Sequence, residues 1–380
     1  MACQVMARAA EGWRTLHGSS RLQGDARRGS DARGAGTIAP RVLSGEGGPA
    51  GYRAEYGVTS TAPPRATTIR DFCHEALFYA GSRVLTAFLN SFVRNGVAAG
   101  DQVLVVLSAA KLNALQESLG AQAALVSFAD MDSVGANPAR IIPLWRSFVD
   151  GLKPGQLARG VGEPVIAQRG PAELAECQIH ESLLNLAFAG CPPFWLLCPY
   201  DTTILDEAVL EEARRSHAYI AGLAHMPVVN GQYVAGEARN ALVREDLPRE
   251  PTDASRSSFD HSSVAISRHS VRAHGEHFGL SQAAAEDLSL AVHEVITNSL
   301  KYGGGQGRLS IWTDSEAIIC EVRDDGHFSN PLAGRSRPEF NGESGRGLWM
   351  ANQLCDLVQI RTGPDGTVVR LHKRHRRDRV

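Results

Sequence analysis

Two kinds of hydrophobic pattern alternate along the chain between residues 69 and 222. Short apolar runs such as Val103–Leu107 and Phe194–Leu197 are typical of buried strands, whereas Leu85–Val93 and Ala139–Val149 space their apolar residues as amphipathic helices do. Further strands are predicted at 75–79 and 125–128, and further helices at 111–119, 172–187 and 205–215. Strands that alternate with helices indicate a largely parallel sheet, so this stretch is expected to form one α/β domain.

A different order of elements follows between residues 259 and 374. The pattern predicts a strand near Ser263–Ser267 and then two helices, Ser270–His277 and Ala283–Leu300. Strands at 308–313, 317–323, 357–362 and 367–372 and a helix at 348–355 complete the predicted elements. Helices and strands that segregate in this way favour an α+β sandwich, with the helices on one face of a mixed sheet.

Three segments lack a sustained apolar pattern. Residues 1–68 are rich in Gly, Ala, Arg and Ser and are expected to be a disordered tail; a nucleic-acid-binding arm would need clustered basic residues with interleaved aromatics. Residues 223–258 gain Pro, Asp, Arg and Ser and are expected to be a linker. Residues 375–380 form a basic tail.

Composition narrows the class of protein. Of the 380 residues, 43% are apolar and 21% charged, which is ordinary for a globular protein, and a net charge of -2 gives no general attraction to nucleic acid or to an anionic membrane. No apolar stretch approaches the length of a membrane span, and the charged N-terminus is unlike a secretory signal. The seven cysteines are scattered without a Cys-x-x-Cys pair, which argues against a disulfide scaffold or a zinc ribbon. A cytoplasmic protein is expected.

The first chemically suggestive pattern lies on the predicted helix 283–300. Glu294 and Asn298 are four residues apart and therefore share one helix face, and Lys301 follows on the same face. An acid, an amide and an ammonium group in one row can position a hydroxyl, a magnesium ion and a phosphate. On its own the pattern is weak, because about one Glu-x-x-x-Asn is expected by chance in a chain of this length.

Two further patterns follow in a fixed order. Asp324 and Gly326 end a predicted strand, where a carboxylate could accept a hydrogen bond from an adenine amino group; the alternative is a plain turn. Gly345 and Gly347 then precede a helix, where backbone N–H groups and the positive end of the helix dipole can face an anion; the alternative is an ordinary helix cap. The chain has no Gly-Lys-Ser/Thr, which excludes a Walker-type phosphate loop.

In this order the stretch 260–373 resembles the ATP-binding fold of the GHKL superfamily. HEVITNSLKYGG, VRDDG and GRGLWMANQLCD are similar to the motifs of the anti-sigma-factor serine kinases, the RsbW-like group. The first domain resembles the MEDS sensory domain in HEALFYAG, NPARIIPLWRSFVD, ECQIHESLLNLAF and LLCPYD. Together the two halves resemble RsbA-like anti-sigma regulatory proteins. The resemblance implies a RecA/KaiC-like α/β domain without a phosphate loop, followed by a Bergerat-type sandwich.

The resemblance also implies roles for individual residues. Glu294 would be the general base, Asn298 the Mg²⁺ ligand and Lys301 a neighbour of the ATP phosphates, while Asp324 would bind adenine beside Gly326. The remaining nucleotide-binding residues would be Gly345, Arg346, Gly347, Leu348 and Thr367. The segment 327–344 would be the ATP lid. Phe328 stands where many members of the superfamily have a second glycine.

The function implied is that of an anti-sigma regulator. It would bind ATP and Mg²⁺, hold a sigma factor, and phosphorylate a serine of an anti-anti-sigma partner, under the control of the first domain and of a small-molecule ligand there. A non-catalytic, ATP-dependent sigma-binding module is the main alternative, and homodimerisation stays open. A sensor histidine kinase would need a two-helix dimerisation segment, and none is found before residue 260. His293 is therefore expected to be a partly buried helix residue.

Two expectations concern the first domain alone. Gly162–Pro164 and Cys198–Asp201 follow predicted strands, at the edge where α/β sheets bind ligands. They could form a sensory pocket or ordinary turns. His74, His180 and His217 are separated without ligand spacing and are expected to be structural.

Overall fold

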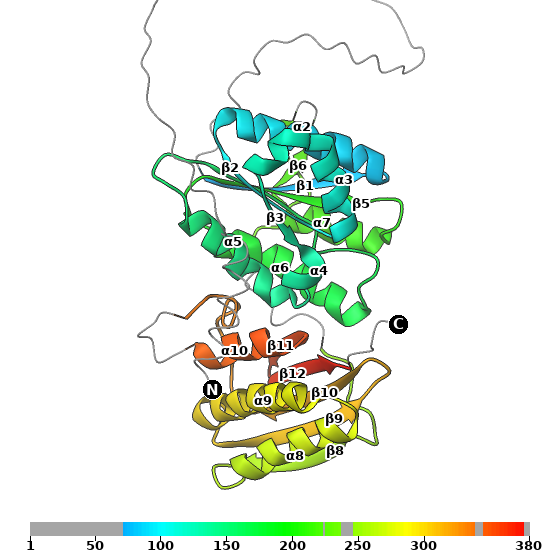
Figure 1. Cartoon of the computed structure of the whole chain (residues 1–380). Coiled ribbons are helices and arrows are strands. Elements are labelled where there is room, and N and C mark those ends of the chain that lie inside the picture. Colours follow the sequence, from blue (N-terminus) through cyan, green and yellow to red (C-terminus); the bar gives the residue numbers. More distant parts are fainter. Residues whose placement is uncertain (1–70, 223–224, 237–245, 339–344, 376–380) are drawn as a thin grey trace, which may run out of the picture. The chain divides into compact units, whose positions relative to one another are not determined.

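The computed structural model describes residues 71–222, 225–236, 246–338 and 345–375, and Figure 1 shows the elements they form. The first domain has a seven-stranded sheet in the order β3-β2-β4-β5-β1-β6-β7. Its strands are β1 (Phe72–Tyr79), β2 (Gln102–Leu107), β3 (Ser127–Asp130), β4 (Ala158–Gly162), β5 (Phe194–Asp201), β6 (Tyr219–Ala221) and β7 (Pro227–Val229). All neighbouring pairs are parallel except β6 and β7, so the predicted α/β domain with a largely parallel sheet is confirmed.

Helices cover both faces of this sheet. The α-helices are α2 (Ser82–Ala99), α3 (Ala109–Leu119), α4 (Met131–Val134), α5 (Ile141–Asp150), α6 (Pro171–Ala187) and α7 (Glu207–Ser216), with 3-10 turns η1 (Gly120–Leu125) and η2 (Pro138–Arg140). Apolar residues of α2 and α3 pack with those of β1, β2 and β5 in one buried cluster that includes Phe92 and Trp195. On α5, Trp145 is buried against β4.

Strand β4 is missing from the elements that the sequence predicts, and its packing explains why. Its sequence, ARGVG, has no apolar run, although all five residues are buried. A Cβ on Gly160 or Gly162 would come within 3.0 Å or 2.8 Å of the Trp145 ring. The two glycines therefore make room for the indole. The Trp145 ring covers the strand, so β4 is buried although its own side chains are not hydrophobic enough to predict it.

The second domain has a five-stranded sheet in the order β11-β12-β10-β9-β8. The strands are β8 (Ser255–Asp260), β9 (Gln306–Thr313), β10 (Ala317–Asp324), β11 (Leu357–Gly363) and β12 (Gly366–Arg374); the helices are α8 (Val264–His277), α9 (Gln282–Tyr302) and α10 (Arg346–Leu354). Every described pairing in this sheet is antiparallel, which corrects the prediction of a mixed sheet. The α+β class itself is confirmed.

The start of the second domain also differs from the prediction. Residues 263–267, which alternate like a strand, belong to the beginning of α8, and the edge strand lies earlier, at β8. Within the predicted linker 223–258, β7 joins the first sheet, and β8 begins three residues before the linker was expected to end. Both sheets therefore extend into that range.

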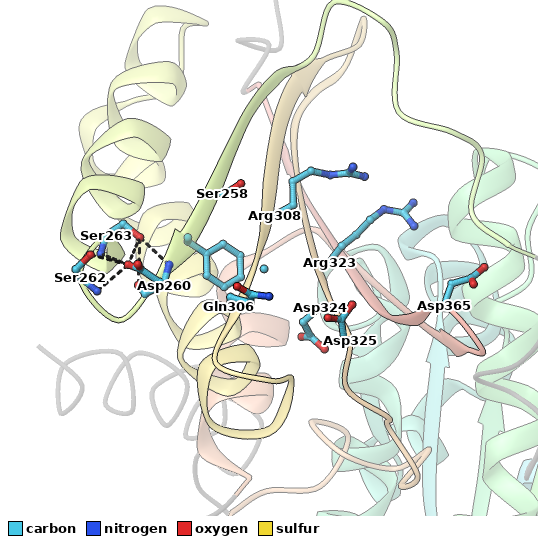
Figure 2. Close-up of a pocket in the computed structure, with 12 residues that line it drawn as sticks. Ser258, Asp260, Ser262, Ser263, Gln306, Arg308, Arg323, Asp324, Asp325 and Asp365 are labelled. Atoms are coloured by element: carbon cyan, nitrogen blue, oxygen red, sulfur yellow. Dashed lines mark hydrogen bonds between the residues drawn. The ribbon is translucent and has the colours of Figure 1, made fainter.

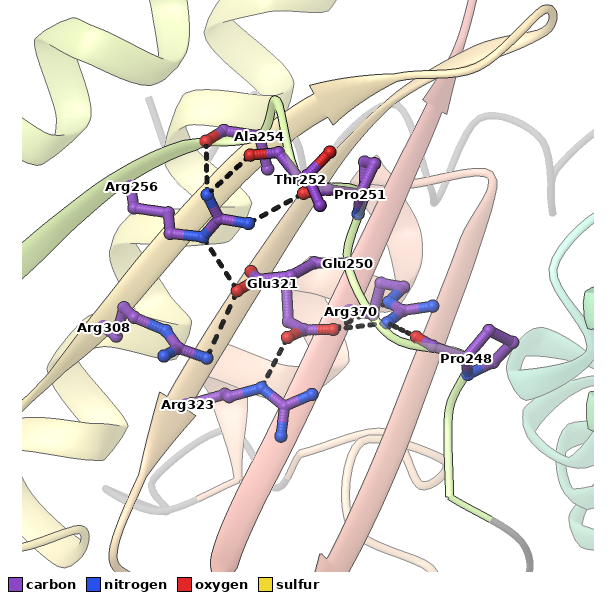
Figure 3. Close-up of polar contacts among 10 residues, drawn as sticks. All are labelled: Pro248, Glu250, Pro251, Thr252, Ala254, Arg256, Arg308, Glu321, Arg323 and Arg370. Carbon is purple, nitrogen blue, oxygen red and sulfur yellow. Dashed lines mark hydrogen bonds and ion pairs between the residues drawn. The ribbon is translucent and has the colours of Figure 1, made fainter.

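Residues 248–254 lie over the second sheet and contribute to its polar contacts, which Figure 3 shows. Arg370 Nε on β12 lies 2.9 Å from Oε2 of Glu321 on the adjacent strand β10. Arg323, on the same strand as Glu321, donates from Nε to Glu321 Oε1 at 2.6 Å. The Arg370 guanidinium also donates to the carbonyl oxygen of Pro248 at 2.7 Å. Glu250 pairs with the Arg256 side chain at 3.0 Å. Since Glu321 and Arg370 are both buried, this segment helps to shield a charged pair from water.

Two further features concern the described residues as a whole. No helix among them is both long enough and apolar enough to cross a membrane. The described cysteines are all buried and free of disulfides: Cys73, Cys177, Cys191, Cys198, Cys320 and Cys355. The predicted tail 1–68 falls outside the described residues, as do residues 376–380 of the predicted tail 375–380 and residues 339–344 at the end of the predicted lid.

Candidate functional site

Helix α9 holds the first group of predicted site residues. Its first turn is capped by Ser281, whose hydroxyl accepts a hydrogen bond from the Ala284 N–H at 3.3 Å, and its buried side fixes it against the sheet. Glu294 and Asn298 are half-buried on one face of the helix. Lys301 is exposed near its end, with its amine 5.0 Å from the centre of the Tyr302 ring. His293 is partly buried, as predicted.

The start of α10 lies directly against this face of α9. Gly345 caps the helix with a φ of 85°, a left-handed conformation that favours glycine. Two residues later, a Cβ on Gly347 would lie 2.9 Å from Glu294 Oε2 and 3.2 Å from Asn298 Nδ2. The first N–H groups of a helix have no partner within it. The fold thus brings the Glu294 carboxylate and the Asn298 amide next to the first turn of α10.

Arg346 and Leu348 flank this contact on α10. Arg346 is exposed and Leu348 is buried, so Leu348 anchors the first turn of the helix in the domain core. Lys301 lies seven residues beyond Glu294 on α9, where the predicted row of side chains continues.

Asp324 lies at the last position of β10, in tight contact with two glycines. Its Oδ1 accepts the N–H of Gly326 at 2.8 Å. A Cβ on Gly303 would approach Asp324 Cγ to 2.3 Å, and a Cβ on Gly326 would lie 2.7 Å from Gly303 Cα. Gly303, which the sequence analysis did not single out, therefore belongs to the site, because any side chain there would displace the Asp324 carboxylate.

Thr367 stands opposite Asp324 in the pairing of β12 with β10. Its hydroxyl donates to the carbonyl oxygen of Gly326 at 2.8 Å and lies 3.3 Å from the hydroxyl of Thr362. Thr362 in turn accepts the N–H of Phe328 at 3.2 Å. Thr362, a second residue that the sequence analysis missed, therefore links the Asp324 turn to the first residues after it, including Phe328.

A cavity of about 620 Å³ opens beside Asp324 and is shown in Figure 2. Its lining residues come from β8, β9, the end of β10 and the β11–β12 turn: Ser258, Phe259, Asp260, Ser262, Ser263, Gln306, Gly307, Arg308, Arg323, Asp324, Asp325 and Asp365. Arg308 and Arg323 face each other across the paired strands. Both also pair with carboxylates, Arg308 with Glu250 at 3.4 Å and Arg323 with Glu321 at 2.6 Å, so the cavity carries charges of both signs.

The residues around Glu294 and around Asp324 fit ATP and a magnesium ion. The Asn298 side chain carries an amide oxygen, a ligand type that Mg²⁺ accepts, and the first turn of α10 lies beside Glu294. The Asp324 carboxylate is oriented by the Gly326 N–H, which donates to Oδ1. A side chain at position 347 would collide with Glu294 and Asn298, and one at position 303 would collide with Asp324, so both glycines keep these groups accessible. Backbone N–H groups, an amide and two carboxylates can together bind a nucleotide and accept a proton from a substrate hydroxyl.

The first domain has a separate cavity of about 650 Å³ at the carboxyl ends of β1, β2, β4 and β5. Glu163 and Asp201, two of the expected pocket residues, both line it. The Lys111 amine lies 2.6 Å from Glu163 Oε1, and the Tyr79 hydroxyl donates to the same oxygen at 2.7 Å. Burial raises the pKa of Glu163, and Lys111 opposes that shift. A cavity therefore lies at these strand ends, lined by Glu163 and Asp201, whereas Cys198 lies buried inside the domain.

Comparisons with known proteins identify a domain family for each half of the chain. Residues 73–218 match the family model of MEDS, described as the methanogen/methylotroph DcmR sensory domain. Residues 258–373 match the family model of the histidine kinase-like ATPase domain. No curated protein matches the chain.

Proposed function

Because the chain joins a MEDS domain to a histidine kinase-like ATPase domain, we propose that it is a cytoplasmic anti-sigma regulator that phosphorylates a serine of an anti-anti-sigma protein. The observation that carries the proposal is the contact of Gly347 with Glu294 and Asn298. It supports the proposal because a carboxylate, an amide and the first turn of α10 lie close together, and such groups can serve as base, Mg²⁺ ligand and phosphate-binding N–H groups.

Each residue of the site has a distinct task in this proposal. Bound ATP with Mg²⁺ supplies the transferable phosphoryl group and the charge that neutralises it. Glu294 accepts the proton of the attacking serine hydroxyl, and Asn298 holds its amide oxygen toward the metal position. The N–H groups of the first turn of α10 bind phosphate oxygens. Asp324, fixed by Gly326, accepts a hydrogen bond from the adenine amino group.

Phosphoryl transfer to a purified antagonist tests the proposal. The full chain, labelled ATP and an antagonist protein that carries the acceptor serine should give an acid-stable phosphoserine, and a serine-to-alanine antagonist should remain unlabelled. Nucleotide binding without transfer would favour the non-catalytic sigma-binding module. An acid-labile phosphohistidine on the chain itself would indicate a histidine kinase. A chain that binds no ATP would refute all three functions.

The first domain would supply the regulation. A cavity lined by Lys111, Glu163 and Asp201 at the strand ends suits a small molecule that carries a polar group. A ligand there would change the affinity for the sigma factor or for ATP, and by linkage each of those would change the affinity for the ligand. Sigma-factor affinity measured with and without small molecules extracted from the host tests this, with Glu163→Gln as the variant that should lose the response.

A further inference from the structure

Four side chains from distant parts of the sequence meet inside the first domain. They are His74 on β1, Glu181 on α6, Cys198 on β5 and His217, which follows α7. Their nitrogen, oxygen and sulfur atoms all lie within 4.8 Å of one another. Each residue is at most 1% exposed, so the group is closed to solvent.

The distances within this cluster resemble those between ligands of one ion. His74 Nε2 lies 3.1 Å from Glu181 Oε2, His217 Nε2 lies 3.4 Å from the same oxygen, and Cys198 Sγ lies 3.4 Å from His74 Nε2. With zinc bonds of about 2.0–2.3 Å, atoms at the corners of a tetrahedron are roughly 3.3–3.6 Å apart. The side chains would therefore need only small shifts to share an ion.

The contacts of the Nδ1 atoms of His74 and His217 indicate that Nε2 is the nitrogen that each ring directs toward the cluster. His217 Nδ1 lies 2.8 Å from the carbonyl oxygen of Ala213, which can only accept, so Nδ1 carries the proton. His74 Nδ1 lies 3.2 Å from Asn185 Oδ1, and the Asn185 amide nitrogen donates to Ser216 O at 2.8 Å, which fixes the orientation of that amide. In the neutral form of each ring, Nε2 is then the nitrogen that lacks a proton and can bind a metal. Metal-binding histidines are commonly oriented by such outer contacts.

Without a cation the cluster is poorly satisfied. His217 Nε2 and Glu181 Oε1 are buried and have no hydrogen-bond partner in the structure. The thiol hydrogen of Cys198 can serve only one of the acceptors that face it. Buried acceptors without partners each cost about 1–3 kcal/mol.

We propose that His74, Glu181, Cys198 and His217 form a closed site for one zinc ion. Two imidazoles, a carboxylate and a thiolate are ligands that zinc accepts in tetrahedral geometry. On binding, the ion forms a bond to Cys198 Sγ and the thiol proton leaves to solvent. Four protein ligands leave no open position, so the ion is structural: it ties α6 and the segment after α7 to the central strands β1 and β5. This inference is independent of the proposed kinase activity.

Metal analysis of the full chain, purified without chelators, is the first test. About one zinc per chain is expected, and replacement by cobalt(II) should give the visible absorption of a tetrahedral site together with a thiolate charge-transfer band. Cys198→Ser should abolish the charge-transfer band and lower zinc affinity at least tenfold. His217→Asn should lower the affinity in the same way.

Two controls separate ligation from general damage to the core. Cys177 is equally buried on α6, and its thiol donates to Pro164 O at 3.3 Å, a bond that serine can keep; Cys177→Ser should retain full metal content. For wild type, chelation should lower the melting temperature and zinc should restore it, whereas His217→Asn, even if destabilised, should show no response to either. Wild-type chain that takes up neither zinc nor cobalt, or equal metal loss in Cys177→Ser and Cys198→Ser, would overturn the proposal.

Discussion

The backbone of Gly347 lies against the carboxylate of Glu294, so closely that a Cβ at position 347 would come within 2.9 Å of Oε2. The contact joins two helices that the sequence separates by a strand pair and a long loop. The first turn of α10 therefore lies beside the acid and the amide of α9.

Gly347→Ala should weaken nucleotide binding at least tenfold while the domain stays folded. The added methyl group would push on Glu294 Oε2 and on Asn298 Nδ2, and so would displace the proposed Mg²⁺ ligand or push the phosphate-binding first turn of α10 away from α9. Calorimetric titration with ATP and Mg²⁺ measures the effect. The matched control is Gly363→Ala in the β11–β12 turn, where an added Cβ meets nothing within 4 Å. Equal ATP affinity in the two variants would show that the start of α10 is not part of the nucleotide site.

Asp324→Asn should reduce ATP affinity by about 1–3 kcal/mol, because an amide can present an NH₂ group to the adenine amine and leave a mismatched pair. The neighbouring Asp325 is exposed, and Asp325→Asn should leave the affinity unchanged. Titration of both variants with ATP and with a nucleotide that lacks the exocyclic amine gives the comparison. Wild-type affinity in Asp324→Asn would remove this carboxylate from adenine recognition.

Glu294→Gln should keep ATP binding but lose turnover or transfer. The side chain lies beside the start of α10, where the phosphates are proposed to bind, so its loss should raise the barrier more than it lowers affinity. The rate of phosphoserine formation at saturating ATP is the measurement. Glu286→Gln, two turns earlier on α9, is the control. If the Glu294→Gln variant transfers phosphate at the wild-type rate, Glu294 is not the base of the reaction.

A fragment of residues 246–380 should fold and bind ATP without the first domain, since the proposed nucleotide residues all lie in it. A fragment of residues 257–380 should melt several degrees lower. It lacks the first two residues of β8 and the Pro248 and Glu250 contacts with Arg370 and Arg308. Thermal melts of the two fragments with and without ATP make the comparison. A 246–380 fragment that folds without binding ATP would show that the first domain completes the site.

Stability of the second domain should fall below neutral pH through His372. Burial, followed by the charge of Arg370, lowers the pKa of this histidine from 6.5 to about 4. The unfolded chain therefore binds more protons than the native chain between those values, and stability present above pH 6.5 is lost as the pH falls toward 4.

Between pH 7 and pH 5, wild type should lose about 2 kcal/mol more than His372→Gln. Unfolding of the 246–380 fragment at the two pH values measures this difference, with the exposed His261→Gln as control. Identical losses in wild type and His372→Gln would show that His372 does not titrate in this range.

The sequence predicts most helices and strands because their apolar spacing matches how they are buried. It fails at β4, where Gly160 and Gly162 carry no hydrophobic signal and burial comes from Trp145. It also fails at residues 263–267, whose alternation of small and polar residues suits either a strand or the start of α8. In both places the deciding partner lies elsewhere in the chain.

The candidate nucleotide residues are predictable for a related reason. Glu294 and Asn298 share a helix face, and Asp324 and Gly326 share a turn, so their spacing along the chain reflects their proximity. The cluster around Glu181 has no such spacing, since His74 and His217 are brought to 3.9 Å between ring centres only by the pairing of β1 with β5 and β6. Gly303 and Thr362 were missed because their role depends on a neighbour across a turn or strand.

The buried cysteines give each domain its own reporter of opening. Of the described cysteines, four lie in the first domain and two, Cys320 and Cys355, in the second, and none is bridged. A thiol reagent reaches such groups only when the surrounding structure opens. If the labelled protein is then digested, the mass gained by the fragments of each domain measures how often that domain opens. If ATP slows the labelling of cysteines in the first domain as well as in the second, the ratio of the first domain's labelling rates without and with ATP gives the coupling free energy between the halves.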